Sequence, residues 1–157
     1  MQSITVLCVG KLKEPAYREL CAEYQKRLGA FVQIHVIELP ETKLPEAPSP
    51  AQITAALAEE ASRIRRAIPQ GAKTVALCVE GKAYTSPAFA QAVDSLGAAK
   101  LIFLVGGSNG LDETLKREAH LRVSFSAMTF PHHLFRVMLL EQLYRAYMIT
   151  TGRTYHK

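Results

Sequence analysis

The sequence predicts a single α/β domain over residues 1 to 157, with a mostly parallel sheet of five to six strands and helices on both faces. Two observations support this fold class. Five short apolar runs of β-type composition recur along the chain, and a segment with helical periodicity or a helix-start signal separates each run from the next. Strands that alternate with helices pair in parallel, because each helix crosses one face of the sheet before the next strand begins.

The first strand, the first helix and the second strand are predicted before residue 40. Residues 4 to 9 form an apolar run that ends at Gly10, which indicates a buried strand. Residues 32 to 39 alternate in polarity and predict the second strand. Between them, apolar side chains recur at helical spacing and Gly29 is a typical helix stop. The apolar face of this helix consists of Tyr17, Leu20, Cys21, Tyr24 and Leu28.

A proline-rich connection and a second helix follow. Residues 40 to 50 contain four prolines, so they form either a plain linker or a mobile loop over a site. Ser49 and Pro50 are typical of a helix start, and apolar residues at 53, 57, 61, 64 and 68 define the inward face. The same helix carries the cluster Arg63-Ile64-Arg65-Arg66. Such a cluster is either a solvated face or a contact with nucleic acid.

Three more strands are predicted at residues 74 to 79, 101 to 105 and 123 to 126. Ser86 is the expected N-cap of a third helix, with Pro87 at its first position and Gly97 as its stop. A fourth helix should begin near Asp112, because residues 112 to 117 are acidic at the start and basic at the end, which suits the helix dipole.

The fourth strand runs directly into Gly106-Gly107-Ser108-Asn109-Gly110. A glycine-rich turn after a strand lets backbone amides approach a ligand, since glycine has no Cβ and tolerates positive φ. The alternative is a tight connection that binds nothing. The spacing differs from the G-x-G-x-x-G fingerprint of dinucleotide-binding proteins.

The last predicted helix, residues 132 to 149, has almost no polar face. A helix that is apolar nearly all round must be covered on every side. One sheet face cannot provide this, so the sequence predicts that a second copy of the chain covers the rest and that the protein is a homodimer.

The net charge of +5 is concentrated near the C-terminus. Residues 132 to 157 carry four Lys or Arg and one Glu, hence three of the five excess positive charges. This distribution favours a polyanionic partner such as RNA. The three cysteines have no C-x-x-C spacing, and no signal peptide, membrane-spanning run or metal-ligand spacing is present, so we expect a cytoplasmic protein with reduced thiols and no metal.

Four motifs together resemble one known family. They are Gly106-Gly107-x-x-Gly110-Leu111, the stretch from Ser124 to His132, the stretch from Glu141 to Ala146, and the C-terminal Tyr155-His156-Lys157. In combination they resemble the RlmH family, the pseudouridine N3-methyltransferases of large-subunit ribosomal RNA in the trefoil-knotted SPOUT class. The resemblance spans the chain and is densest after residue 74.

The resemblance implies a C-terminal trefoil knot in which the segment 125 to 132 threads behind the Gly106 turn. It also implies that S-adenosylmethionine binds, bent, in this knot. Backbone groups of the turns would read the adenine edge while apolar walls enclose it. The corresponding cofactor-binding residues here are Leu77, Gly106, Phe125, Ser126, Ala127, Met128, Thr129 and Phe130.

Methylation of a pseudouridine N3 requires placement of the base against the methyl group and removal of the imide proton. A histidine, with an ordinary pKa of about 6.5, suits a base or a donor, and arginine suits a phosphate or carbonyl oxygen. We therefore predict an active site that is shared between the two subunits of a homodimer and that acts on ribosomal RNA or the ribosome. The predicted catalytic residues are His156, Arg136, Arg153 and Tyr155.

Structural roles remain open for two of these candidates and for His132, and functions of other classes remain open for the chain. Arg136 can pair with Glu141, Tyr155 can pack across the dimer, and His132 can cap its helix. A non-catalytic RNA-binding protein of the ribosome that keeps the knot is the main alternative function. A dinucleotide-dependent oxidoreductase is less favoured, because the glycine turn follows the fourth strand and lacks the fingerprint.

Overall fold

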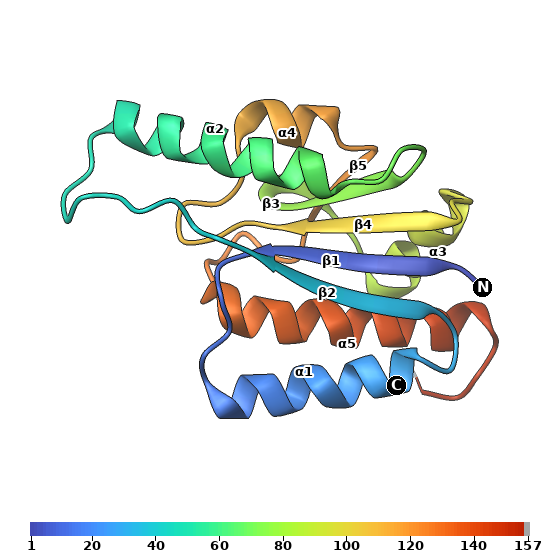
Figure 1. Ribbon diagram of the computed structural model, residues 1–157. Coiled ribbons are helices and arrows are strands. Elements are labelled where there is room, and N and C mark those ends of the chain that lie inside the picture. Colours follow the sequence, from blue (N-terminus) through green and yellow to red (C-terminus); the bar gives the residue numbers. More distant parts are fainter. Residues whose placement is uncertain (156–157) are drawn as a thin grey trace.

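The computed structural model of the protein describes residues 1–155 and shows a three-layer α/β fold (Figure 1). Strands and helices alternate strictly along the chain. Their bounds are β1 Ser3–Val9, α1 Pro15–Leu28, β2 Gln33–Leu39, α2 Pro50–Ala67, β3 Lys73–Ala83, α3 Ser86–Ser95, β4 Lys100–Val105, α4 Glu113–Glu118, β5 Leu121–Ser124 and α5 His132–Thr150.

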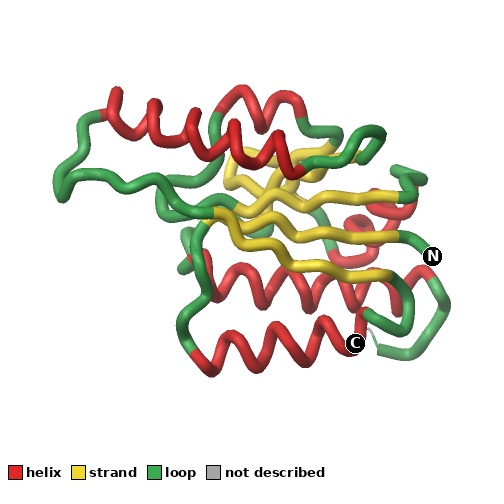
Figure 2. The backbone as a smooth tube through the Cα atoms, viewed as in Figure 1, coloured by secondary structure: helices red, strands yellow, loops and turns green. Residues whose placement is uncertain are grey.

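The five strands form one parallel sheet in the order β2-β1-β4-β3-β5. In the register at its centre, Ile4 of β1 lies between Ile34 of β2 and Leu101 of β4. Helices α2 and α4 cover one face, and α1, α3 and α5 cover the other (Figures 1 and 2). The prediction of a mostly parallel sheet with helices on both faces is confirmed. The trefoil knot stays a prediction.

Strand β3 is longer than predicted because it continues through a bulge. The apolar run ends at Val79, but the strand extends to Ala83, and both Leu77 and Lys82 pair with Val123 of β5. Gly81 makes this return possible, since a Cβ there would lie 2.7 Å from the Val123 backbone nitrogen. The bulge therefore projects residues 78 to 81 from the carboxyl end of the sheet.

Local capping follows the sequence closely, with one correction. Ser49 forms a full capping box with Gln52 at the start of α2. The predicted N-cap of α3 was wrong by one residue, because Thr85 accepts the hydrogen bond from the Ala88 amide at 3.2 Å. Ser86 instead donates its hydroxyl to Oε1 of Gln142 on α5 at 2.8 Å, which ties the two helices together.

Helix α5 lies at the centre of its layer, between α1 and α3 (Figure 1). Most of its apolar positions are buried or half-buried already in one chain, so α1 and α3 supply more cover than the sequence alone indicated. Leu20 of α1, by contrast, was predicted on the inward face and is 46% exposed. It borders a groove along α5 that is described below.

Candidate functional site

A pocket of about 310 Å³ lies where the carboxyl ends of β3 and β4 meet the segment that follows β5. This is where ligands bind in open parallel sheets, because the connections leave a crevice there. Seven of the eight predicted cofactor-binding residues line the pocket. They are Leu77, Gly106, Phe125, Ser126, Met128, Thr129 and Phe130, whereas Ala127 does not line it.

The glycine turn forms one wall through an unusually close backbone contact. A Cβ on Gly106 would lie 2.3 Å from the carbonyl oxygen of Gly110, and one on Gly107 would lie 2.8 Å from Oε1 of Glu41. The Gly110 amide donates to the Gly107 carbonyl at 3.1 Å and closes the turn. Gly106 is therefore required by the turn itself, whether or not a ligand is bound.

Gly106→Ala should lower the thermal stability of the protein, because its methyl group would overlap the Gly110 carbonyl and force the turn apart. We expect a loss of about 2 kcal/mol in the free energy of unfolding, and Gly106→Val should also abolish ligand binding. Gly29→Ala is the matched control, since its φ of −58° is helical and its added Cβ would meet the nearest atom, the Lys26 carbonyl oxygen, only at 3.3 Å. Equal unfolding curves for wild type and Gly106→Ala, recorded by circular dichroism, would contradict this account.

The opposite wall is the segment from Phe125 to Phe130. The Met128 amide donates to Oγ of Ser126 at 3.0 Å, and Oγ of Ser124 donates to the Ser126 carbonyl at 3.1 Å. These bonds fold the segment into a compact turn. Phe125 fixes its start, with its ring 4.8 Å from that of Phe135.

The proline-rich connection is anchored beside this pocket. Oε1 of Glu41 accepts from the Ser108 amide at 3.1 Å, while Arg63 donates to the Pro40 carbonyl at 2.8 Å. The arginines of the cluster Arg63-Ile64-Arg65-Arg66 contact groups of the same chain. Arg65 pairs with Glu118 at 3.0 Å and Arg66 donates to Ser62. Arg65 and Arg66 remain exposed, as expected for a solvated face, and a contact of this cluster with nucleic acid stays a prediction.

Charged side chains gather on one side of the pocket, at the β3 bulge and α4. Lys116 is 8% exposed, and its ammonium contacts Glu80 and donates to Glu113 at 2.7 Å. Burial acts to lower the pKa of Lys116, but the hydrogen bonds to Glu113 and Glu80 raise it above 10.5. This cluster has no signal in the sequence, because Glu80 follows an apolar run as an ordinary turn residue and Lys116 matches the helix dipole.

Arg136 lies outside this pocket, one turn along α5 from His132. It is 3% exposed, donates to Oε2 of Glu38 at 2.7 Å and to the Gly10 carbonyl at 3.2 Å, and its Nε has no partner. The alternative that Arg136 pairs with Glu141 is wrong, since Arg145 takes that carboxylate at 2.5 Å. The guanidinium of Arg136 thus joins the start of α5 to the ends of β1 and β2.

His132 opens α5 and lines the pocket, but it does not cap the helix. The N-cap position is Pro131, and no side chain caps this end. Burial and the neighbouring His133 lower the pKa of His132, which keeps its ring neutral near pH 7. His133 pairs with Glu14 at 2.9 Å.

The C-terminal candidates lie against the far half of α5. The Arg153 guanidinium lies 4.9 Å from the ring centre of Phe31, and the Tyr155 ring lies 4.8 Å from that of Tyr144. The Tyr155 hydroxyl reaches Oε1 of Glu141 at 3.4 Å. Glu141 itself lies about 14 Å along the helix from His132. His156 lies outside the described residues. A single chain therefore does not bring Arg153 and Tyr155 to its own pocket.

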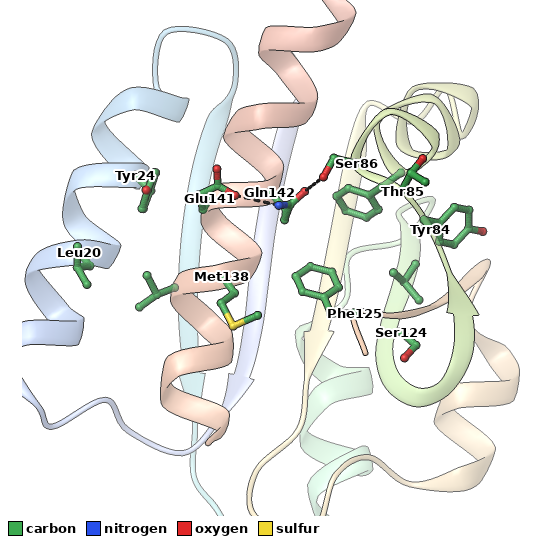
Figure 3. A pocket seen from close by; sticks show the side chains of 13 residues that line it. Leu20, Tyr24, Tyr84, Thr85, Ser86, Ser124, Phe125, Met138, Glu141 and Gln142 are labelled. Carbon is green, nitrogen blue, oxygen red and sulfur yellow. Dashed lines mark hydrogen bonds between the residues drawn. The ribbon is translucent and has the colours of Figure 1, made fainter. Parts of the chain in front are cut away.

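A groove of about 430 Å³ runs along α5 between α1 and α3 (Figure 3). Figure 3 shows Leu20 and Tyr24 on one side, Met138 and Glu141 on α5, and Phe125 on the other side. Phe125 also lines the smaller pocket, so the groove adjoins it. No helix among residues 1–155 is long and apolar enough to cross a membrane.

Comparison with known proteins identifies the family. The model of the family described as "Predicted SPOUT methyltransferase" matches residues 2–156. Proteins named ribosomal RNA large subunit methyltransferase H are 43% identical in Streptococcus equi subsp. zooepidemicus and 41% identical in Listeria monocytogenes serotype 4a. These alignments cover 98% and 99% of this chain and 99% of each relative. The resemblance predicted from the motifs is confirmed, and the chain belongs to the SPOUT methyltransferase family, in its ribosomal RNA large subunit methyltransferase H group.

Proposed function

We propose that this protein transfers a methyl group from S-adenosylmethionine to N3 of a pseudouridine in large-subunit ribosomal RNA. The observation that carries the proposal is the pocket between the glycine turn and residues 125 to 130, in a chain whose relatives are named for methylation of this RNA. Membership of a methyltransferase family also removes the support for the oxidoreductase alternative.

The residues around the pocket fit a bent nucleoside ligand. Leu77, Val105 and Leu111 supply apolar walls, and the close contact of Gly106 with Gly110 leaves bare backbone beside them. Backbone groups of such turns can pair with the edge of adenine, while apolar walls exclude water from the reacting atoms. When bound, S-adenosylmethionine supplies an electrophilic methyl group on its sulfonium sulfur.

The RNA side of the reaction is assigned to the C-terminal tail of a second subunit. Arg153 is suited to hold a phosphate or a carbonyl oxygen, Tyr155 to position the base, and His156 to accept the N3 proton. The Tyr155 hydroxyl contacts Glu141, about 14 Å along α5 from His132 of the pocket, and this separation supports use of the tail in trans. Arg136, buried against Glu38, acts in this proposal as a positioning residue that holds α5 and His132 in place.

The second subunit is proposed to pack on the groove along α5. Sedimentation should then give a mass near twice 17.3 kDa at micromolar concentration. Met138→Glu, which places a charge in this groove, should shift the protein to monomer, whereas Ile37→Glu, 40% exposed on the edge strand β2, should not. A monomeric wild type at these concentrations would contradict the dimer.

The function is tested with ribosomal RNA from a strain that lacks the protein. Purified protein and S-adenosylmethionine should restore one methylated pseudouridine in the large-subunit RNA, as mapped by mass spectrometry of nuclease fragments. Free RNA, isolated large subunits and assembled ribosomes are compared as substrates in parallel. Transfer to none of the three would contradict the proposed function and leave the RNA-binding alternative.

A further inference from the structure

The charged cluster of Glu80, Lys116 and Glu113 lies on the wall of the ligand pocket and has no role yet in the proposed reaction. Lys116 is 8% exposed, although an α4 side chain of its length can usually reach solvent. Its ammonium is directed at two carboxylates that remain half or more exposed, 51% for Glu80 and 75% for Glu113. The Lys116 ammonium is thus fixed in place, while the carboxylates of Glu80 and Glu113 can still accept further hydrogen bonds.

Stability alone is a weak reason for this arrangement. Ion pairs with such exposed acids contribute little to the free energy of unfolding, while burial of an ammonium is unfavourable. The cluster also lies at the β3 bulge, which projects Glu80 and which requires glycine at position 81, because a Cβ there would lie 2.7 Å from the Val123 backbone nitrogen. Bulges beside ligand sites commonly serve to aim a side chain.

The remaining pocket lining contrasts with this cluster. Apart from His132, the other lining side chains are apolar or neutral. S-adenosylmethionine has a neutral adenosine and an amino-acid end with one ammonium and one carboxylate. A bound zwitterion needs an opposite charge near each of its ends. Within the described chain, the cluster is the part of the pocket that offers both signs of charge.

We propose that this cluster binds the amino-acid end of S-adenosylmethionine. Lys116 lies opposite the carboxylate of the ligand. Glu80, supported by Glu113, lies opposite the ammonium of the ligand. The inference rests on the proposed function, because it assumes that this ligand enters the pocket. It assigns the adenosine to the glycine turn and to residues 125 to 130, at the other side of the same pocket.

The test compares two ligands by calorimetry on the full-length protein. S-adenosylhomocysteine carries the amino-acid end, whereas 5′-methylthioadenosine keeps the adenosine and lacks that end. Lys116→Met should weaken S-adenosylhomocysteine about tenfold or more, because a charged hydrogen bond is lost, and change 5′-methylthioadenosine by less than about twofold. Glu80→Gln should act in the same direction. Lys82→Met is the matched control, since Lys82 lies across the bulge over the Tyr84 ring and does not line the pocket.

The outcomes separate this inference from the proposed function. Equal losses for both ligands in Lys116→Met and Glu80→Gln would assign the cluster to the ribose or to folding and overturn the inference, as would unchanged binding of both. Wild-type protein that binds neither ligand would instead contradict the use of S-adenosylmethionine. If Lys116→Met does not fold, Glu80→Gln decides alone, because Glu80 is half exposed and its amide can still accept from Lys116.

Discussion

Deletion of Thr154 to Lys157 should leave a folded protein that binds its methyl donor and barely transfers the methyl group. Within the described part of this segment, Thr154 is exposed and Tyr155 packs one ring against Tyr144, so little core is removed. The deletion also removes the groups proposed to place the base and accept its proton. Loss of positioning and acid–base catalysis together should lower the transfer rate by several orders of magnitude. Single-turnover methylation of ribosomal RNA measures this directly.

Single substitutions should divide the roles within the tail. His156→Ala should lower the transfer rate with little change in RNA affinity, whereas Arg153→Ala should weaken RNA binding and reduce its salt dependence. Arg66→Ala is the control for loss of a surface charge, because Arg66 lies on α2 and bonds to Ser62 of its own helix. A tail-deleted protein with wild-type transfer would refute the assignment of the chemistry to this segment.

A mixed dimer decides whose pocket each tail serves. One parent carries the tail deletion, and the other carries Thr129→Trp, an exposed position at which a bulky ring can fill the pocket without displacing the core. Each parent dimer should be inactive. If the tail works in trans, the mixture holds one intact pocket facing one intact tail and regains activity. A folded mixture without activity would show that each chain uses its own tail.

Most elements of this fold follow from local signals in the sequence. The strand runs, the capping box at Ser49 and the stop at Gly29 are all written within a few residues, and they predict the alternation of strands and helices. The strand order β2-β1-β4-β3-β5 has no such local signal. The same holds for the extension of β3, since residues 80 to 83 have the composition of a turn and only the pairing of Lys82 with Val123 and of Ala83 with Ser124 makes them part of the strand.

The candidate site divides in the same way. The glycine turn and residues 125 to 130 are visible as motifs, and seven of the eight residues assigned from the family resemblance line one pocket. The charged cluster on its wall joins Glu80 to Lys116, 36 residues apart, through a bulge that periodicity does not reveal. Arg136 shows the reverse case. Its motif pointed to catalysis, but its partner Glu38 lies 98 residues away and is fixed only by the packing of α5 on the sheet.

Arg136→Met should be the most destabilising of the side-chain substitutions considered, because it leaves Glu38 and the Gly10 carbonyl without their charged partner. Removal of one member of a buried ion pair typically costs about 3–5 kcal/mol. Glu38 keeps 35% of its side chain exposed, so we expect the lower end of that range. Arg27→Met is the control, since Arg27 pairs with Glu23 at 2.9 Å on an exposed helix surface and its loss should change the free energy of unfolding far less. Urea unfolding measures both.

The pH dependence of unfolding provides a second, independent readout of the same pair. Burial acts to raise the pKa of Glu38, but hydrogen bonds from Arg136 and the Leu12 amide lower it below 4.5 in the folded protein. A carboxylate whose folded pKa is depressed stabilises the fold fully above its unfolded pKa, and this stabilisation disappears as the pH falls through the folded pKa. Wild-type protein should therefore lose stability more steeply below pH 4.5 than Arg136→Met does.

A double variant, Arg136→Met with Glu38→Gln, tests the same pair in another way. Its loss in free energy of unfolding should be smaller than the sum of the losses of the two single variants, because both substitutions remove the same interaction. Parallel pH curves and additive losses would show that Arg136 is not held by Glu38, and would return it to the list of residues free to contact RNA.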